Sequence, residues 1–457
     1  MINRSLTKYL ISGALLALFT VAMYFAVESP KKEIKWDFNE GWYETFDLAN
    51  GMQIIVIPNH KVPAVSHMVW YKVGAMEDPR GKTGIAHFLE HLMFKGTEEY
   101  PDGEFSKQVS KNGGRENAFT SHDFTAYYQN IAKEKLAMVM KMEADRMRNL
   151  QFDKKQVDAE RKVVIEERKM SIDNSPRRLL NEQMDAAQFM NHPYGTQIIG
   201  WLHDIENLKL EDALNFYRKY YAPNNAILVV AGDVTSDEVK KLAEKYYAGI
   251  KKSDLAKAED YTIPEQRIEK RIELKDERVR EPELWRSYIA PSQKYGNTEQ
   301  AFPLIVLSKI FGGGTTSRLY KSLVIDQKAA VSIGSYYNDL KRGPSKFTMF
   351  AIPAQNKDIP DLEQAINEEV QKIIDRGVSE EELESAKKSL VADQIYAREG
   401  LQEMAYLAGE ATTVGLDPEY ITTWTDRINA VTAMQVQQAA QEVLNQSSSV
   451  TGVLTNE

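Results

Sequence analysis

The sequence predicts an α+β protein made of two related α/β domains, each with a sheet packed against helices, preceded by one hydrophobic N-terminal helix. Of the 457 residues, about 430 follow that first segment, which is more than one ordinary core accommodates. Segments patterned as strands alternate with segments patterned as helices, and the order in the first half recurs in the second. We expect an N-terminal segment over residues 1–30, a first domain over 37–255 and a second domain over 265–457.

The N-terminal segment has the character of a membrane anchor. Residues 9–27 carry no charged side chain and follow Arg4 and Lys8. This stretch is longer than the apolar region of most cleaved signals and approaches the roughly 20 residues that cross a bilayer. We predict an uncleaved anchor in the inner membrane of a bacterial cell envelope, facing the periplasm. The alternative is a cleaved signal and a free periplasmic protein, because small residues, Ala22 and Ala26, lie near its end.

Composition excludes some classes of protein. The formal net charge is −9 and the pI is about 5.5, and no stripe of basic residues is visible, so we expect no nucleic-acid partner. Cysteine is absent, which excludes a disulfide framework, a lipid-anchoring cysteine and a thiolate metal ligand.

Several segments of the first half have clear patterns. Residues 53–58 and 66–73 are rich in Ile, Val and aromatic residues, as strands are. The double glycine at 113–114 predicts a turn, with a strand after it. Residues 210–221 have a helical pattern and residues 226–232 form an apolar run, so we expect a helix and then a buried strand.

The helix predicted over residues 84–94 carries the candidate metal site. His87, Glu90 and His91 are three and four positions apart, which places them on one helical face. Two imidazoles one turn apart can hold one metal ion, and the carboxylate beside them can act on a water molecule at that metal. This H-x-x-E-H order is the inverzincin signature. The side expected to face inward carries Ile85, Phe88, Leu89 and Leu92.

The alternative is a core helix whose histidines are satisfied by hydrogen bonds. The chain holds seven histidines, so a chance H-x-x-E-H is expected in fewer than about one such chain in a hundred. We therefore favour a metal site. A lone histidine is more often structural, and we expect no ligand role for His122, His192 or His203.

A third ligand has to come from another element, because a catalytic zinc usually has three protein ligands and one open position. Residues 153–171 are patterned as a long helix, and the side expected to face the core carries Val157, Glu160, Val163, Val164 and Glu167. A carboxylate on such a side is costly unless it binds something. Glu167 is the candidate ligand and Glu160 a candidate partner for a histidine. We expect Lys162 and Glu166 to pair on the exposed side; the alternative is a solvated, charge-rich helix.

These residues resemble the pitrilysin family of zinc peptidases, which includes mitochondrial processing peptidase and many bacterial zinc proteases. The resemblance rests on His87, Glu90 and His91, on Glu160, and on Glu167, which lies 76 positions after His91 as in that family. It covers most of the chain after the N-terminal segment and is stronger in the first half. It implies one Zn²⁺ per chain, held by His87, His91 and Glu167, with Glu90 as the general base. It also implies mostly antiparallel sheets in a half clamshell.

The resemblance further implies where a peptide substrate would bind. In the family, the strand matching Asn117, Ala118, Phe119 and Thr120 is an exposed edge beside the metal. A substrate peptide joins that edge as an extra strand through main-chain hydrogen bonds. From the residues alone, an interior strand of the same sheet is an equal alternative.

The second half repeats the order of elements without the metal residues. We expect strands 285–290 and 346–352 to correspond to strands 66–73 and 119–128, helix 381–397 to the ligand helix, and residues 424–453 to residues 201–230. Ser379 is the expected N-cap of helix 381–397, with Glu382 completing a capping box. This half contains no histidine, so it cannot repeat the metal site.

The glycine-rich residues 311–319 are interpreted as a flexible connection into a helix. They lack the Lys-Ser/Thr pair of a phosphate loop. They resemble a family landmark in which an arginine and a tyrosine, seven positions apart, hold the substrate carbonyl and the developing oxyanion. The corresponding positions here are Val324 and Val331. A homologous partner subunit that supplies both donors is therefore expected.

The sequence as a whole predicts a zinc-dependent endopeptidase that cleaves extended peptides or unfolded protein segments, as the catalytic subunit of a heterodimer. Its Glu90 would take a proton from water and give it to the leaving amine. The alternative is a non-catalytic peptide-binding or assembly subunit with structural zinc or none.

Overall fold

The computed structural model describes residues 42–255, 259 and 261–456. Residues Tyr43–Glu457 form one compact unit. The predicted N-terminal anchor lies outside the described residues. Within the part of the chain that the structure describes, no helix combines the length and apolar character needed to cross a membrane.

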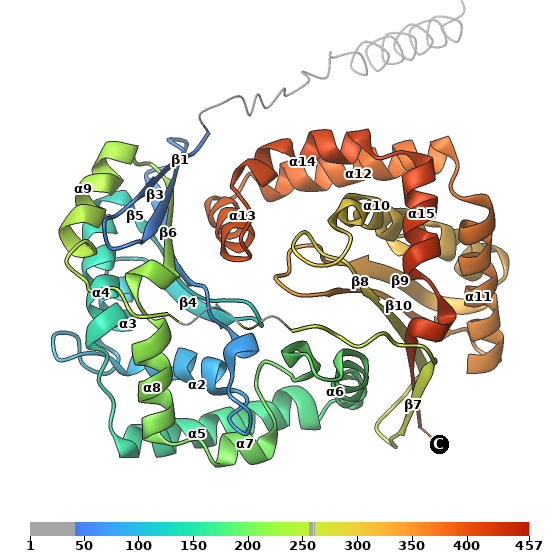
Figure 1. Cartoon of the computed structure of the whole chain (residues 1–457), viewed down its shortest axis with the longest axis horizontal. Helices are drawn as coiled ribbons and strands as arrows, with labels where there is room; N and C mark the ends of the chain where they lie inside the picture. Colours follow the sequence, from blue (N-terminus) through green and yellow to red (C-terminus); the bar gives the residue numbers. More distant parts are fainter. Residues whose placement is uncertain (1–41, 256–258, 260, 457) are drawn as a thin grey trace, which may run out of the picture. The chain divides into compact units, whose positions relative to one another are not determined.

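The first sheet has six strands in the order β1-β2-β6-β3-β5-β4. The strands are β1 (Glu44–Asp47), β2 (Gln53–Pro58), β3 (Ala64–Tyr71), β4 (Arg115–Thr120), β5 (Thr125–Ala132) and β6 (Ala226–Gly232). Only β2 and β6 pair in parallel; the other pairs are antiparallel. Figure 1 shows β6, drawn in green, among blue strands from the beginning of the described chain. The predicted strand at 53–58 and the buried strand at 226–232 are confirmed.

Apart from α6, the helices of this half pack on one face of the first sheet. The helices of this half, α6 included, are α2 (Ile85–Leu92), α3 (Glu104–Lys111), α4 (Leu136–Asn149), α5 (Lys154–Arg168), α6 (Pro176–Phe189), α7 (Leu202–Glu206), α8 (Leu210–Tyr220) and α9 (Ser236–Tyr246). Apolar residues of α2 and α4 share one buried core with Val69 and Tyr71 of β3. Burial of that shared surface, at about 25 cal/mol per Å² of apolar area, is what fixes α2 against the sheet.

The second sheet repeats the first with one strand fewer. Its order is β7-β11-β8-β10-β9, and its one parallel pair, β7 with β11, takes the place of β2 with β6. Its strands are β7 (Lys270–Lys275), β8 (Glu283–Ala290), β9 (Ala330–Tyr337), β10 (Ser345–Pro353) and β11 (Ser449–Thr455). The predicted repetition of elements is confirmed, except that β10 corresponds to β5, which begins at Thr125 and not at Phe119. The expected domain boundaries stay a prediction.

The helices of the second half are α10 (Ala301–Gly312), α11 (Ile359–Arg376), α12 (Glu380–Ala397), α13 (Leu401–Thr413), α14 (Glu419–Ala430) and α15 (Ala433–Val443). The predicted capping box is confirmed at α12, where Ser379 is the N-cap and Glu382 the third helical residue. The glycine-rich stretch leads into a short π-helical segment, Tyr320–Asp326.

Two helices are exchanged between the halves. Helix α13 packs on β3 and β6 of the first sheet, and α6 packs on β7 and β11 of the second (Figure 1). Side chains alternate along a strand, so Trp70 projects to the face opposite Val69 and Tyr71, where it meets Gly409 of α13. On the other sheet, Gly452 of β11 lies against Met184 of α6. Each sheet therefore has helices from both halves of the chain on its faces.

Candidate metal centre

Helix α2 presents the motif residues because its other side is buried. Ile85, Ala86, Phe88, Leu89 and Leu92 are buried, as the apolar periodicity predicts. The helix begins after Gly84, whose φ of 86° favours glycine. Asp78 lies six residues earlier, and its carboxylate accepts hydrogen bonds from the backbone N–H groups of Gly84 (2.6 Å) and Ala86 (3.1 Å).

Helix α5 brings the two glutamates of the second segment toward α2. Its N-cap is Asp153, which forms a capping box with Gln156. Val157, Glu160 and Val164 are buried as expected. The expectation for Val163 is wrong, because its side chain is 50% exposed. Successive residues on a helix are about 100° apart, so Val163 and Val164 cannot both face the core.

The prediction that Glu166 pairs with Lys162 on the exposed side of α5 is also wrong. Glu166 pairs with Lys169 (2.7 Å), one residue beyond the end of the α-helix, and not with Lys162. The buried Arg168 next to it binds the Glu182 carboxylate (2.8 Å) and donates to the Gly200 carbonyl (2.7 Å). This fully buried pairing anchors the helix end that carries Glu167.

The structure brings His87, His91 and Glu167 together. One ligand atom from each residue lies within 4.8 Å of the other two. His91 Nε2 is 3.2 Å from Glu167 Oε2, and His87 Nε2 is 3.6 Å from Glu167 Oε1. Tetrahedral zinc with bonds of 2.0–2.1 Å needs ligand atoms roughly 3.4 Å apart. Two imidazole nitrogens and a carboxylate oxygen are also an ordinary zinc donor set, so these residues fit the ion.

Glu160 orients one of the imidazoles. Its Oε1 is 2.9 Å from His91 Nδ1 and its Oε2 is 2.8 Å from Lys95 Nζ. Burial would raise the pKa of Glu160, but the hydrogen bonds from His91 and Lys95 outweigh it and lower the pKa. With Nδ1 donating to Glu160, His91 Nε2 is the nitrogen that faces Glu167.

The two histidines differ electrostatically. Burial, reinforced by the neighbouring His91, lowers the pKa of His87 to about 4, so His87 is neutral near pH 7. Burial would lower the pKa of His91 as well, but hydrogen bonds to Glu160 and Glu167 raise it to about 9. The hydrogen bond from His91 in turn lowers the pKa of Glu167.

Glu90 lies beside this cluster and touches the predicted substrate strand. Thr120 Oγ1 at the end of β4 donates a 2.5 Å hydrogen bond to Glu90 Oε2. Burial raises the pKa of Glu90, although the hydrogen bond from Thr120 opposes the shift. A carboxylate with a raised pKa is suited to accept and return a proton.

Strand β4, which contains Asn117, Ala118, Phe119 and Thr120, lies at the edge of the first sheet. It pairs with β5 on one side, and no described strand pairs with it on the other. The edge placement is therefore the one observed, not the interior alternative. Whether these four residues bind a peptide stays a prediction.

The remaining histidines have partners away from the cluster. His60 contacts Asp233, His67 contacts Gln129, His122 contacts the Thr196 carbonyl, His192 accepts from the Tyr194 N–H, and His203 contacts Asp204. Sequence reasoning missed Asp78 and Lys95. Asp78 is too far from α2 in sequence for any capping pattern, but Lys95 is one turn beyond His91 and its spacing could have suggested a role.

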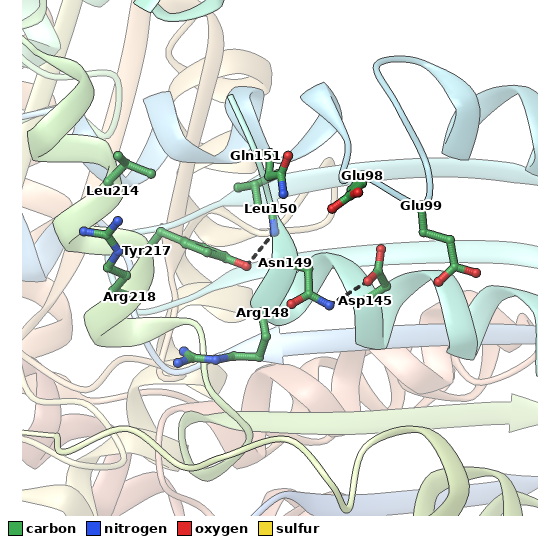
Figure 2. Close-up of a pocket in the computed structure, with 10 residues that line it drawn as sticks. All are labelled: Glu98, Glu99, Asp145, Arg148, Asn149, Leu150, Gln151, Leu214, Tyr217 and Arg218. Atoms are coloured by element: carbon green, nitrogen blue, oxygen red, sulfur yellow. Dashed lines mark hydrogen bonds between the residues drawn. The ribbon is translucent and has the colours of Figure 1, made fainter. Parts of the chain in front are cut away.

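A cavity of about 660 Å³ lies elsewhere, between α4 and α8. Figure 2 shows its lining residues, with Tyr217 bonded to the Leu150 N–H and Asn149 bonded to Asp145. Arg148 is engaged by the Tyr221 carbonyl (3.0 Å). Each of these polar groups therefore already has a protein partner.

Comparisons with known proteins agree with this arrangement. Residues 53–200 match the family described as Insulinase (Peptidase family M16), and residues 207–390 match Peptidase M16 inactive domain. The chain is 32% identical to the zinc protease PqqE of Helicobacter pylori, over 80% of this chain and 82% of that protein. The crystal structure of a protease from Helicobacter pylori aligns with a TM-score of 0.84 and 30% identity, covering 90% of this chain and 99% of that one. This chain belongs to peptidase family M16.

Membership of the M16 family confirms the resemblance and the fold expected from the motif. The probable mitochondrial-processing peptidase subunit beta of Schizosaccharomyces pombe is 29% identical over 46% of each chain. All the candidate metal and catalytic residues fall in residues 53–200, the part matched by the insulinase description. The part matched by the inactive-domain description begins after them, at residue 207.

Positions 324 and 331 of this M16 chain, where the family resemblance places an arginine and a tyrosine, are both valine. Val331 is exposed on β9, and Val324 lies in the segment Tyr320–Asp326. The nearby Arg318 is held by Glu382, with Nη2 2.6 Å from Oε2. Arg318 is therefore committed to α12.

Proposed function

We propose that this M16 chain is a zinc-dependent endopeptidase acting on extended peptides or unfolded protein segments. The observation that carries the proposal is the convergence of His87, His91 and Glu167 at distances suited to one ion. Glu160 supports it by fixing His91 from behind. The relatives named zinc proteases support the same chemistry.

His87, His91 and Glu167 would hold the ion. Zinc, when bound, supplies a Lewis acid that polarises the peptide carbonyl and makes water more acidic. Glu90 accepts a proton from the attacking water and delivers it to the leaving amine, with Thr120 holding its carboxylate in place. The peptide adds to the free edge of β4 by main-chain hydrogen bonds, so it has to be extended and unfolded locally.

The chain would act with a homologous partner in the bacterial cell envelope. One missing oxyanion donor can cost roughly a hundredfold or more in rate, and Val324 and Val331 stand where the resemblance expects an arginine and a tyrosine. A partner that carries both donors would restore them. The uncharged residues 9–27 support attachment to the inner membrane, with the described residues facing the periplasm.

The test is metal analysis together with hydrolysis of a quenched fluorescent peptide. We expect one zinc per chain, weak turnover by the chain alone, and at least a hundredfold higher turnover with the homologue that carries the arginine and tyrosine. Full activity of the chain alone would rule out the need for a partner. No hydrolysis with or without the partner would overturn the endopeptidase assignment.

A second candidate is a non-catalytic peptide-binding or assembly subunit. The match to the description Peptidase M16 inactive domain and the two valines favour it. The complete set of His87, Glu90, His91 and Glu167 opposes it, because a subunit without catalysis has no use for the general base. Zinc binding and peptide binding without hydrolysis in any pairing would select this candidate.

A further inference from the structure

A second cavity lies between α6 and the second sheet. Some of its lining residues follow the candidate ligand Glu167 closely in sequence. Its volume is about 410 Å³. Helix α6 supplies one wall and strands β8, β9 and β10 supply the other. The residues that matter for its chemistry are Arg177, Arg178, Trp285, Tyr336, Lys346 and Thr348.

The sheet wall is aromatic and contains an unpartnered hydroxyl. Thr348 is the cross-strand partner of both Tyr336 and Ser287, so the three side chains project from one face. Tyr336 is 48% exposed. Thr348 is only 3% exposed, and its Oγ1 has no hydrogen-bond partner among the described residues. A buried polar group without a partner is unusual, and a ligand atom in the cavity would satisfy it.

The charge of the lining is mainly positive. Arg178 makes no ion pair with any described residue. Arg177 binds Glu283 through Nε (2.7 Å) and Nη2 (2.5 Å), which leaves its other N–H groups available. Lys346 is paired with Asp185, the one acidic residue of the lining. The cavity therefore has cationic donors to spare for an incoming carboxylate.

One lining residue of the cavity follows the candidate ligand Glu167 closely along the chain. Ile172 lines the cavity and follows Glu167 by five residues of continuous helix, a rise of about 7 Å. An extended peptide advances about 3.3 Å per residue. An extended peptide covers a distance equal to that rise in about two residues.

We propose that this cavity is a specificity subsite that takes an acidic side chain of the peptide substrate. Arg178, assisted by the free N–H groups of Arg177, binds the carboxylate, and the Thr348 hydroxyl donates a hydrogen bond to it. Trp285 and Tyr336 pack against the methylene groups. This inference rests on the proposed peptidase function, because it takes the peptide to be the ligand.

Measuring peptide binding to a catalytically inactive variant tests this inference independently of catalysis. The probe is a fluorescein-labelled twelve-residue peptide with Glu at positions near its centre, compared with versions carrying Gln or Lys there. Fluorescence anisotropy against the Glu90→Gln chain should rank Glu above Gln and Gln above Lys. Arg178→Glu should weaken binding of the Glu peptide by about two- to fivefold and strengthen binding of the Lys peptide, since an exposed charge pair contributes up to about 1 kcal/mol.

The matched control is Lys241→Glu on α9, an exposed residue distant in sequence from the lining, which changes the net charge by the same amount. It should leave the ranking unchanged; an equal effect of both reversals would overturn the subsite. Thr348→Val keeps the side-chain shape and should not lower the unfolding temperature, yet it should weaken binding of the Glu peptide. A fall in stability without a change in binding would contradict the role of the hydroxyl.

The outcomes also distinguish the two proposals. If the wild-type chain cleaves peptides but shows no preference among Glu, Gln and Lys, the subsite is wrong and the peptidase function stands. If the charge ranking is present and Arg178→Glu reverses it, but no peptide is cleaved with or without the partner, the subsite stands and the peptidase function is wrong.

Discussion

At the scale of single residues, the candidate centre depends on how neighbours hold the side chains. Thr120 donates a hydrogen bond to Glu90, and Glu160 is hydrogen-bonded to His91 and forms an ion pair with Lys95. Each of these contacts joins two protein side chains, so the fold itself positions the groups. Such preorganisation is what allows catalytic groups to act without a costly rearrangement.

Glu90→Gln should abolish peptidase activity without releasing zinc. The amide can still accept the hydrogen bond from Thr120, but it cannot take a proton from water. General-base catalysis contributes about 10²- to 10⁴-fold, so kcat should fall by that range while the zinc content stays equal to that of the wild type. Peptide hydrolysis and metal analysis on the same sample check this, and retained turnover would refute the assigned base.

Glu160→Gln should weaken zinc binding rather than the proton transfer. Loss of the carboxylate behind a ligating histidine typically costs about 10- to 100-fold in metal affinity. Competition with a chelator of known affinity measures the loss. The control is Glu166→Gln, an exposed change on the same helix, which should leave the affinity within error. Equal affinities in both variants would remove Glu160 from the site.

At the scale of elements, much of the site could be predicted and some of it could not. The three- and four-residue spacing predicts that His87, Glu90 and His91 share a face, and the apolar stripe of α5 predicts that Glu160 is buried. The same stripe predicts that Val163 is buried, which is wrong because Val163 is exposed while Val164 faces the core. Asp78 was missed because a cap that approaches from a distant turn leaves no local pattern in the sequence.

The contact between α13 and β3 gives a prediction about packing. A Cβ added to Gly409 would lie 2.1 Å from Cε2 of the fully buried Trp70. Helix propensity alone would favour alanine by about 1 kcal/mol, whereas overpacking of a buried contact costs typically 1–3 kcal/mol. Gly409→Ala should therefore lower the urea midpoint. Gly249→Ala, where nothing lies within 4 Å, is the control and should be close to neutral; a stabilised Gly409→Ala would contradict the contact.

At the scale of the whole molecule, the repeat could be predicted but the exchange of α6 and α13 could not. Corresponding strands and helices recur in order because their patterns recur. An apolar helix face predicts that a helix is buried, but it does not predict on which of two similar sheets the helix packs. The choice depends on contacts between residues more than 250 positions apart, such as Trp70 with Gly409, which no local periodicity encodes.

The same exchange predicts a pH dependence of stability. Burial, with Asp339 and Asp123 nearby and opposed by Lys341, raises the pKa of Glu410 on α13 from 4.5 to about 7. Between pH 4.5 and 7, the Glu410 carboxyl is therefore still protonated in the folded state but already ionised in the unfolded state. The free energy of unfolding thus falls as pH rises from about 4.5 to 7 and then levels off. Glu410→Gln should remove this loss of stability. The loss amounts to at most about 3 kcal/mol in the free energy of unfolding, at 1.36 kcal/mol per pKa unit.

The measurement is the thermal unfolding midpoint at pH 4.5 and pH 8. The Glu410→Gln chain should match the wild type at the lower pH and exceed it by a few degrees at the higher pH. Glu403→Gln, an exposed change on the same helix, should follow the wild type at both. A constant difference between Glu410→Gln and wild type would show that the carboxyl does not titrate in this range.

The exchange also bears on what happens when the backbone is broken. Because α6 belongs to the second sheet by contact and α13 to the first, a single cut between α9 and β7 would leave two fragments that still clasp each other. Dissociation of the fragments would remove the helix that packs on a face of each sheet and would expose residues such as Trp70 to water. A protease that nicks this connection would yield two bands on a denaturing gel but one species by gel filtration.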